Sequence, residues 1–432
     1  MLDAIAHRGG AGRDVFQTGG VTMGAVWPSG QTDSLSVAEA MVQDRAGSGR
    51  LARAVGRHDR LTLERDGAGV APLYYGRTSE GVLCFASEVK ALLSLTRQVM
   101  ALPPGGRYDG IAPPGSERPS PGPELDAPPE LLAAELRGRL ESAVVRSLSD
   151  TQAGVWLSGG LDSSAIATLA RRYTATLHTF AVGLPGAPDL AAARRAAEYL
   201  GTRHHELAAS LDEVVRELPA VIFHLESFDA LLVRSSVLNF LAGKAASSYV
   251  AAVLSGEGGD ELFAGYEYLR WLPAERLGAE LLDITSRLHN TALQRVDRCS
   301  QAHGVLACVP FLDPQVVEYA LRIPTRWKLH EGTEKWILRQ AVRDDLPEPL
   351  RNRRKAKFWE GAGIGDLLAQ RAEEGISDAQ FQRERVLSNG WRLQSKEEVM
   401  YYRIFRDHFG DLPTLDWMGR TRRVPGSPGG AS

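Results

Sequence analysis

From Gly154 to Arg172 the chain reads GVWLSGGLDSSAIATLARR. Its apolar residues 155–157 predict a buried strand, and the apolar spacing from Ser163 to Arg172 predicts a helix. A short loop of serine, glycine and one aspartate joins the two. In open parallel sheets, ligands bind where such loops leave the carboxyl ends of strands. The stretch therefore predicts an α/β fold with a ligand site at this loop.

The alternation of strand and helix continues along the chain. Residues 178–184 and 250–254 have the pattern of buried strands, and residues 188–200 have that of a helix. Strands that alternate with helices predict a parallel sheet with helices on both faces. Beyond residue 270 the pattern is mostly helical.

Composition divides the chain into a small unit, a linker and a large domain. Residues 1–102 contain short strand-like runs and predict a β-rich unit. Residues 103–129 are dense in proline and glycine and predict an irregular linker. Residues 130–418 have the alternating pattern and predict the large α/β domain. We expect a disordered tail over residues 419–432.

Charge and cysteine usage exclude several classes of function. The 432 residues include 50 Lys plus Arg against 53 Asp plus Glu, a formal net charge of −3, so no basic footprint points to nucleic acid or an anionic membrane. Cys84, Cys299 and Cys308 are not spaced as a metal site or a disulfide framework. No signal peptide or membrane-spanning run is visible. We expect a cytoplasmic protein without nucleic-acid or membrane partners, and a homodimer is compatible with the sequence.

The loop from Ser158 to Ser164 has the chemistry of an anion site. Gly159 and Gly160 lack a Cβ, so their backbone can approach a ligand closely, and the N–H groups at a helix start favour negative charge. Serine hydroxyls add donors, and Asp162 can hold a divalent cation that shields phosphate charge. No lysine follows the glycines, which favours pyrophosphate held as a leaving group over a transferable γ-phosphate. The alternative interpretation is a turn with helix-capping residues.

This loop and four later motifs resemble one known family. Residues 158–164, SGGLDSS, resemble the pyrophosphate loop of the ATP-pyrophosphatase superfamily. The motifs that follow in order are FAVGLPGAPDLAAARRAAEYLGTRHHE (180–206), LSGEGGDELFAGY (254–266), VPFLD (309–313) and EKWILR (334–339). Together they resemble the synthetase domain of asparagine synthetases over most of residues 130–415.

The first part of the chain resembles pieces of the same family's glutaminase domain. The matching stretches are AIAHRGG (4–10), RDGAGVAPLYYG (65–76) and FASEVKALL (85–93). The whole resemblance implies an adenine nucleotide alpha hydrolase-like α/β fold, preceded by a small β-rich remnant of an Ntn glutaminase domain.

The resemblance implies an ATP-dependent carbon–nitrogen ligase that uses Mg²⁺. In that family a carboxylate attacks the α-phosphorus of ATP, giving an acyl-adenylate and pyrophosphate, and an amine then displaces AMP. The implied catalytic residues are Glu257, as base for the amine, Lys335 and Lys355, and the implied metal carriers are Asp162 and Asp260. The residues implied for ATP and pyrophosphate are Leu157, Ser158, Gly159, Gly160, Leu161, Asp162, Ser163, Ser164, Val182, Ser255 and Gly256. Those implied for the substrate pocket are Leu232, Arg234 and Arg295.

Some of these residues have a simpler alternative role. Lys355 lies in a basic run, RRKAKF (353–358), which is also typical of a solvated surface. Glu257 could cap the helix that begins near Asp260. The adjacent His204 and His205 lie on a predicted strand and so point to opposite faces, which favours a structural or nucleotide-shelf role over a metal site.

The N-terminal unit departs from the family. A working glutaminase domain needs a cysteine directly after the initiator Met, and here Leu2 follows Met1, although a wrongly assigned start could hide that cysteine. The stretch between Gly10 and Ala68 is far shorter than the family requires, and the Asn-Gly-Glu-Ile-Tyr-Asn and Asp-Thr-Glu segments are absent. We therefore expect that glutamine is not cut and that the amine is ammonia or another molecule's amino group.

The substrate pocket departs from the family as well. Members that make asparagine have threonines where Leu231 and Leu232 precede Arg234, and Glu-Ala-Arg where residues 306–308 read Leu-Ala-Cys. Each lost hydrogen bond costs on the order of 1–3 kcal/mol if its partner stays buried. We expect a small-molecule carboxylic acid that is larger or less polar than aspartate, and a role in specialised metabolism such as natural product biosynthesis.

Three alternatives stay open at this point. β-Lactam synthetases and lasso-peptide cyclases use the same adenylation on an intramolecular amine, although Glu257 stands where the β-lactam group has other residues. An ATP-pyrophosphatase acting on tRNA would need a basic face or thiols near the loop. A non-catalytic interaction protein is disfavoured because the residues implied for catalysis are intact, namely Asp162, Glu257, Asp260 and Lys355.

Overall fold

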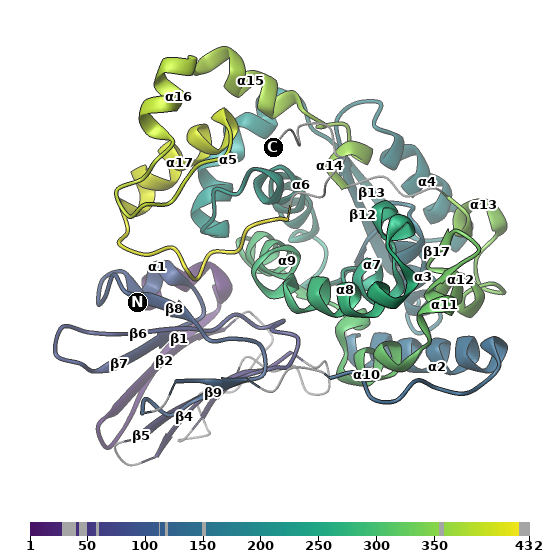
Figure 1. Cartoon of the computed structure of the whole chain (residues 1–432), viewed down its shortest axis with the longest axis horizontal. Coiled ribbons are helices and arrows are strands. Elements are labelled where there is room, and N and C mark those ends of the chain that lie inside the picture. Colours follow the sequence, from purple (N-terminus) through teal and green to yellow (C-terminus); the bar gives the residue numbers. More distant parts are fainter. Residues whose placement is uncertain are drawn as a thin grey trace.

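The computed structural model describes residues 1–27, 40–42, 50–57, 60–111, 113–116, 120–148, 153–353 and 358–422. Antiparallel strands form its N-terminal unit, and its C-terminal domain surrounds a parallel sheet with helices (Figure 1). This architecture confirms the α/β class that the alternation of strand and helix predicts.

The described residues of the N-terminal unit form three small antiparallel sheets. A hairpin joins β1 to β2, a second sheet has the order β10-β9-β5-β4-β3, and a third has the order β7-β6-β8. Met23, Leu63, Tyr75 and Leu102 are buried together in its apolar core. The bounds are η1 Leu2–Arg8, β1 Gly12–Thr18, β2 Val21–Trp27, β3 Ala40–Val42, β4 Ala52–Arg57, β5 Arg60–Arg65, β6 Tyr74–Arg77, β7 Leu83–Ala86, α1 Val89–Leu92, β8 Val99–Ala101, β9 Gly106–Tyr108 and β10 Gly115–Ser116.

The proline-rich segment expected to be an irregular linker is partly ordered as strand. β9 and β10 lie within residues 103–129, and β9 pairs antiparallel with β5, with Tyr108 opposite Leu63. A tight turn precedes β9, in which Gly106 N donates to Pro103 O at 2.9 Å. Proline and glycine thus turn the chain back onto the N-terminal sheet before it enters the large domain.

Within the described ranges, five parallel strands form the sheet of the large domain, in the order β13-β12-β11-β14-β15. The chain passes from β11 (Ala153–Trp156) through β12 (Leu177–Gly183) to β13 (Arg203–Ala208). It then crosses to the other side of β11 and forms β14 (Ala252–Leu254) and β15 (Leu306–Cys308). The direction of strand order therefore reverses between β11 and β14, where doubly wound sheets open a crevice for ligands.

Helices cover both faces of this sheet. α3 (Leu161–Arg171) and α4 (Pro188–Leu200) pack on each other and on β12, whereas α6 (Ala230–Ala246) packs on β12 and β13 and contacts α9 (Ala292–Gln301). Right-handed crossovers place these two pairs on opposite faces. β12 is buried along its whole length, as expected for a parallel strand covered on both sides.

The remaining helices form the shell around this domain, with α15, α16 and α17 grouped beside α5 (Figure 1). Of the helices in the described ranges, none combines the length and apolar character that a bilayer crossing requires. The further bounds are α2 Pro129–Ser147, α5 Leu211–Leu225, α7 Gly259–Phe263, η2 Glu267–Trp271, α8 Ala274–Ser286, η3 Leu288–Asn290, η4 Pro310–Leu312, α10 Pro314–Arg322, α11 Thr325–Lys328, β16 Leu329–His330, β17 Thr333–Glu334, α12 Trp336–Ala341, α13 Glu348–Arg351, α14 Phe358–Gly361, α15 Leu367–Gly375, α16 Asp378–Glu384 and α17 Lys396–Phe409.

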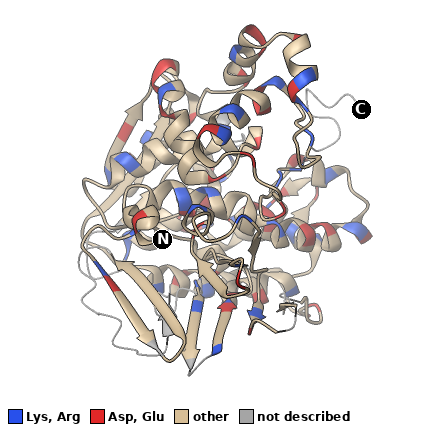
Figure 2. Ribbon diagram, turned by 90° about the vertical axis from the view of Figure 1, so that its left-hand side faces the viewer, with Lys and Arg blue, Asp and Glu red and all other residues tan. Residues whose placement is uncertain are grey.

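The first residues of the expected disordered tail are anchored. Thr421 N and Oγ1 donate to the Asp229 carboxylate at 3.1 and 2.7 Å. Residues 423–432 lie outside the described residues, so disorder there stays a prediction. Figure 2 shows that residues of both charges are interspersed over the ribbon in this view, in keeping with the balanced composition.

Candidate active site

The loops after β11 and β14 meet at the point where the strand order reverses. A Cβ on Gly259 would lie 2.7 Å from Asp162 Cγ, and a Cβ on Gly256 would lie 3.0 Å from Asp162 Cβ. Side chains at either glycine would push the two loops apart. The fold therefore brings the motifs SGGLDSS and LSGEGGDELFAGY into one site.

The SGGLDSS loop is held in shape by its own hydroxyls. Gly159 has a φ of 70°, and a Cβ there would overlap the backbone of Ala192. Ser158 Oγ lies 3.2 Å from Ser163 Oγ and accepts from Gly160 N at 3.3 Å. α3 begins at Leu161 without a side-chain cap among the described residues. The N–H groups of its first turn are thus available to an anion.

Lys335 joins carboxylates from both loops. Its Nζ lies 2.5 Å from Asp162 Oδ2 and 2.6 Å from Asp260 Oδ1, and its side chain is 5% exposed. Lys335 has a φ of 54°, a backbone conformation that residues other than glycine rarely adopt. Its backbone N–H donates to Phe263 O at 3.1 Å. A Cβ on Gly265 would overlap both Asp260 Oδ1 and Lys335 Cε. An unfavourable backbone conformation that holds a buried lysine between two acids is typical of a functional site.

The two aspartates fit the ligand preferences of Mg²⁺. Asp162 Oδ1 is buried and has no hydrogen-bond partner within the described ranges. Asp162 and Asp260 both lie within ion-pair distance of the Lys335 ammonium. Mg²⁺ is usually bound by one or two carboxylates together with substrate phosphates. Among the described residues, no group of three or more His, Cys, Asp or Glu side chains is placed to hold a metal ion.

Glu257 forms an ion pair with Arg295 of α9. The Glu257 side chain is 23% exposed and that of Arg295 is 11% exposed. The N-cap of α7 is Gly258, with a φ of 95°, so Glu257 does not cap this helix. The structure thus brings together two of the residues that the resemblance implies, one for catalysis and one for the substrate pocket.

A second buried acid lies four residues after Glu257. Glu261 is 3% exposed and accepts a hydrogen bond from the Tyr266 hydroxyl. Burial raises the pKa of Glu261 to about 7, and the charge of Glu257 adds to this shift. Glu261 and Tyr266 were not among the predicted site residues. Both lie in the motif LSGEGGDELFAGY, but α7 is too short for its periodicity to show which side chains are buried.

Arg234 is engaged by acids of the C-terminal helices. Its Nε and Nη2 donate to Glu397 at 2.8 and 2.6 Å, and its Nη1 donates to Asp366 at 2.7 Å. Leu232 is buried on the same helix, α6. Because protein carboxylates fill the guanidinium fork, a substrate carboxylate would have to replace one of them, and Asp366, 72% exposed, is the more accessible.

Arg353 was also missed by sequence reasoning. It donates from Nη1 to Ser158 O at 2.8 Å and from Nη2 to Asp189 Oδ1 at 2.5 Å, and so ties the SGGLDSS loop to α4. The pairing joins residues far apart in sequence, which no local pattern indicates. Lys355, two residues further on, lies outside the described residues, and its catalytic role stays a prediction.

The other residues implied for nucleotide binding lie where strands end. Leu157 N donates to Phe180 O at 2.9 Å just after β11, and Ser255 N donates to Cys308 O at 2.8 Å just after β14. Val182 is the buried penultimate residue of β12. All three therefore lie at the same edge of the sheet as the loops described above.

His204 and His205 point to opposite sides of β13, as predicted. His205 Nε2 lies 2.9 Å from His178 Nδ1, whereas His204 Nδ1 lies 3.0 Å from Thr179 Oγ1. Each histidine thus joins β13 to the neighbouring strand β12 on its own face of the sheet.

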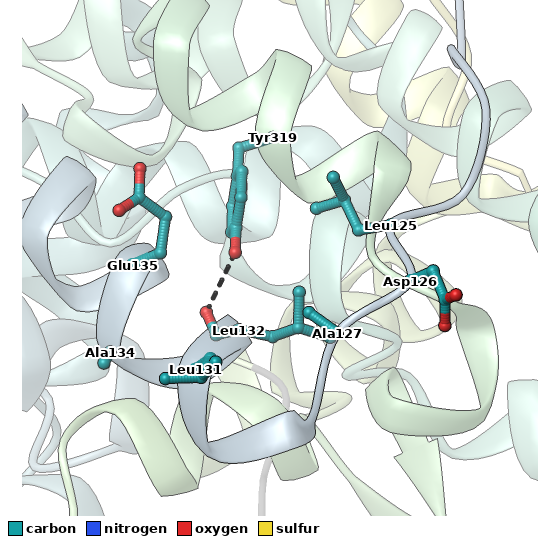
Figure 3. A pocket seen from close by; sticks show the side chains of 8 residues that line it. All are labelled: Leu125, Asp126, Ala127, Leu131, Leu132, Ala134, Glu135 and Tyr319. Atoms are coloured by element: carbon teal, nitrogen blue, oxygen red, sulfur yellow. Dashed lines mark hydrogen bonds between the residues drawn. The ribbon is translucent and has the colours of Figure 1, made fainter.

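A separate hollow of about 500 Å³ lies between the segment before α2, α2 itself and α10 (Figure 3). The Tyr319 hydroxyl donates to Leu132 O at 3.3 Å at its edge. Its lining is mostly apolar and includes none of the predicted site residues: Leu125, Asp126, Ala127, Leu131, Leu132, Ala134, Glu135 and Tyr319. The polar side chains at the point where the strand order reverses, among them Asp162, Asp260 and Lys335, are therefore the stronger candidate for an active site.

The fold and the glycine–serine loop are those of the ATP-pyrophosphatase superfamily. Within it, the family model for asparagine synthase matches residues 135–282 and 274–414, and the model for a glutamine amidotransferase domain matches residues 32–94. The chain belongs to the asparagine synthase family.

Named relatives agree with this assignment. Asparagine synthetase [glutamine-hydrolyzing] 2 of Arabidopsis thaliana is 35% identical over 379 residues, which cover 80% of this chain and 64% of the relative. Asparagine synthetase B [glutamine-hydrolyzing] of Escherichia coli is 35% identical over 396 residues, which cover 86% of this chain and 70% of the relative. This chain thus spans less than two thirds of the length of the plant enzyme.

Proposed function

We propose that this protein is an asparagine synthetase-like ligase that joins a carboxylic acid to ammonia or an amine and converts ATP to AMP and pyrophosphate. The supporting observation is that Lys335 bridges Asp162 and Asp260 beside the uncapped start of α3. A buried cation, N–H donors and carboxylates that can hold a metal ion are groups that stabilise the charge of a bound triphosphate. The family membership of the chain supports the same reaction.

In the first step, an oxygen of the substrate carboxylate attacks the α-phosphorus of ATP, and the bond from this phosphorus to pyrophosphate breaks. The N–H groups at the start of α3 and the hydroxyls of Ser158 and Ser163 would bind the pyrophosphate. Lys335 would balance the negative charge that develops on it. Mg²⁺ held by Asp162 and Asp260 would supply further charge neutralisation when bound.

In the second step, the amine nitrogen attacks the acyl carbon, and the bond from this carbon to the AMP oxygen breaks. The nitrogen must lose a proton, and Glu257 is the proposed acceptor. Its ion pair with Arg295 orients the carboxylate within the site. Both half-reactions thus use loops that leave neighbouring strands of the sheet.

We further propose that glutamine is not the amine donor, although both named relatives are glutamine-hydrolysing. The glutamine amidotransferase model matches only residues 32–94. The interior segments that bind glutamine in this family have no counterpart between Gly10 and Ala68. Ammonium chloride should therefore support amide formation and glutamine should not. Release of glutamate from glutamine above a no-enzyme control, with the Escherichia coli relative as positive control, would refute this proposal.

The acid is proposed to be larger or less polar than aspartate. The buried Leu232 offers no hydrogen bond, and Arg234 is already paired with Glu397. A pocket built in this way favours an acid with apolar surface beyond its carboxylate. The acid substrate can be identified by mass spectrometry of the acyl-AMP that forms when the protein is incubated with ATP and a panel of carboxylic acids that includes L-aspartate.

The test of the whole proposal is ATP–pyrophosphate exchange with the acids of that panel. Asp162→Asn should lower the exchange rate about 10²–10³-fold, because the charge facing the metal and Lys335 is lost. Asp212→Asn, at the exposed start of α5, is the matched control and should leave exchange unchanged. Exchange at the wild-type rate in Asp162→Asn would mean that the loop is a structural turn.

A further inference from the structure

α9 is a polar helix that is buried. Its sequence reads ALQRVDRCSQ, yet every residue from Leu293 to Gln301 is buried. Charged side chains are rarely buried unless they are paired. Their partners lie in two directions, since Arg295 pairs with Glu257 of the candidate active site, whereas Asp297 and Arg298 contact the N-terminal unit.

Asp297 is bound by two arginines of the N-terminal unit. Arg8 donates to its Oδ2 and Arg50 donates to its Oδ1, and both guanidinium groups are buried. Burial alone would raise the pKa of Asp297, but Arg8 and Arg50 outweigh it and hold this pKa below the ordinary value. The carboxylate is therefore ionised and held from both sides.

Arg298 extends these contacts to two further buried acids. Its Nη1 lies 3.4 Å from Glu88, which also accepts from Arg8, and its Nη2 donates to Glu226 at 3.2 Å. Glu226 in turn accepts from Lys90 N at 2.7 Å, at the start of α1. We refer to these residues as the interdomain ion cluster: Arg8, Arg50, Glu88, Lys90, Glu226, Asp297 and Arg298.

Stability alone does not account for this cluster. Transfer of a charge out of water costs several kcal/mol per ion, and buried ion pairs often stabilise a protein no more than apolar residues of the same size. Directional bonds between buried charged groups do, however, specify one arrangement of the elements that they join. The interdomain ion cluster therefore fixes the register of α9 against the N-terminal unit.

This register determines where Arg295 stands. Arg295 precedes Asp297 by two residues on the same rigid helix, so a rotation or shift of α9 would move its guanidinium away from Glu257. Gln294 Nε2 adds a bond to Leu225 O at 2.7 Å, which joins α9 to the end of α5. We infer that Arg8, Arg50 and Glu88 of the N-terminal unit are positioning residues that keep Arg295, and through it Glu257, in place for amide formation.

This inference rests on the proposed role of Glu257 as the base. The N-terminal unit would then help to position Arg295 and Glu257, a role that does not require glutamine hydrolysis. None of the three positioning residues is proposed to touch a substrate, so they should affect the amide-forming step and leave adenylation largely intact.

The first test is the variant Arg8→Gln in the full-length protein. Amide formation should fall about 2- to 30-fold, the range for residues that act through coupling. ATP–pyrophosphate exchange should change little. Both rates are measured with the carboxylic acid of the panel that gives the fastest ATP–pyrophosphate exchange. Amide formation is measured by single-turnover quench with ammonium chloride as the amine. Arg13→Gln, which removes an exposed ion pair with Asp3 in the same unit, is the matched control.

A double-mutant cycle separates positioning from a general loss of structure. In a Glu257→Gln background, Arg8→Gln should have little further effect on amide formation, because the carboxylate base that Arg8 helps to position is already absent. Arg8→Lys keeps the positive charge but loses the forked guanidinium group. Its rate of amide formation should lie between those of wild type and Arg8→Gln. Equal losses in both backgrounds, or equal losses of exchange and amide formation, would overturn the inference.

Hydrogen–deuterium exchange provides a readout that needs no substrate. In Arg8→Gln, amides of α9 and of residues 255–260 should exchange faster, whereas those of α4 should not change. If wild type shows no ATP–pyrophosphate exchange with any acid, the proposed function fails while this readout still tests the positioning. Unchanged protection of residues 255–260 would overturn it.

Discussion

Lys335 donates from Nζ to Asp162 Oδ2 at 2.5 Å, across 173 residues of sequence. The same nitrogen lies 2.6 Å from Asp260 Oδ1, so one ammonium serves carboxylates from two loops. The group stands where the strand order of the sheet reverses, which is where folds of this class bind ligands. Its geometry therefore links the fold to the proposed chemistry.

Lys335→Met should abolish most of the adenylation activity. The methionine side chain has a similar length, but it cannot balance the negative charge on the departing pyrophosphate, and Asp162 and Asp260 lose their shared cation. We expect ATP–pyrophosphate exchange to fall about 10²–10³-fold. Lys244→Met removes a lysine that is 59% exposed and is the matched control. An exchange rate within a few-fold of wild type would show that Lys335 is only structural.

Gly265→Ala should disrupt the same group through packing. The new Cβ would overlap Asp260 Oδ1 and Lys335 Cε, and overpacking of this kind costs about 1–3 kcal/mol. We expect a lower free energy of unfolding in urea together with a loss of exchange activity. Gly138→Ala, in the interior of α2, is the contrasting control. Its Cβ meets nothing within 4 Å, so it should stabilise the protein by about 0.5–1 kcal/mol. Equal stability of the two variants would contradict the packing argument.

Local patterns predicted much of the large domain. The helix expected over residues 188–200 is α4, whose start is marked by Pro188 at a first helical position, and the strand expected over 178–184 is β12 to within one residue. Gly159 and Gly160 of SGGLDSS predicted a ligand loop at the end of a strand, and in the structure this loop meets LSGEGGDELFAGY at Asp162. These predictions succeeded because each depends on a few neighbouring residues.

Features that depend on pairing across the chain could not be predicted in this way. α9 is polar enough to suggest a surface helix, and its burial depends on partners such as Arg8, which is 289 residues from Asp297. The contact of Arg353 with Ser158 O and the short strand β9 within the proline-rich segment are of the same kind. Local propensity is a weak guide wherever tertiary contacts outweigh it.

Lys328 should make stability depend on pH. It lies at the end of α11 and is fully buried, and burial lowers its pKa to about 7 from the ordinary lysine value of 10.5. Between these values the unfolded chain binds more protons than the folded protein, so stability rises with pH from about 7 to about 10.5. Below pH 7 the folded protein must keep a buried charge, and the full cost applies.

Lys328→Met should remove this dependence. We expect a gain of about 1–4 kcal/mol at pH 7, the range found when buried charges are replaced by apolar residues of similar size. The free energy of unfolding, measured in urea at several pH values from 7 to 10, should rise less steeply than in wild type. Lys244→Met should keep the wild-type slope. A parallel pH profile in Lys328→Met would show that this amine does not titrate in the folded protein as proposed.

Glu257→Gln should separate the two half-reactions. The amide keeps the size of the side chain and can still accept from Arg295, but it cannot take a proton from the incoming amine. Acyl-AMP should therefore form at nearly the wild-type rate, whereas amide formation should fall about 10²–10⁴-fold, the range for loss of a positioned general base. A higher pH should partly restore the amide step, because more of the ammonium ion or amine is then already deprotonated.

The measurement is a single-turnover quench that counts acyl-AMP and amide separately, with ammonium chloride as the amine. Gln294→Ala, which removes a different buried bond of α9, controls for general loosening of that helix. A block of acyl-AMP formation in Glu257→Gln would assign Glu257 to the activation step, because the carboxylate would then be needed before any amine enters. An unchanged amide rate would mean that another group accepts the proton, and the buried Glu261 with its Tyr266 partner would be the next candidate.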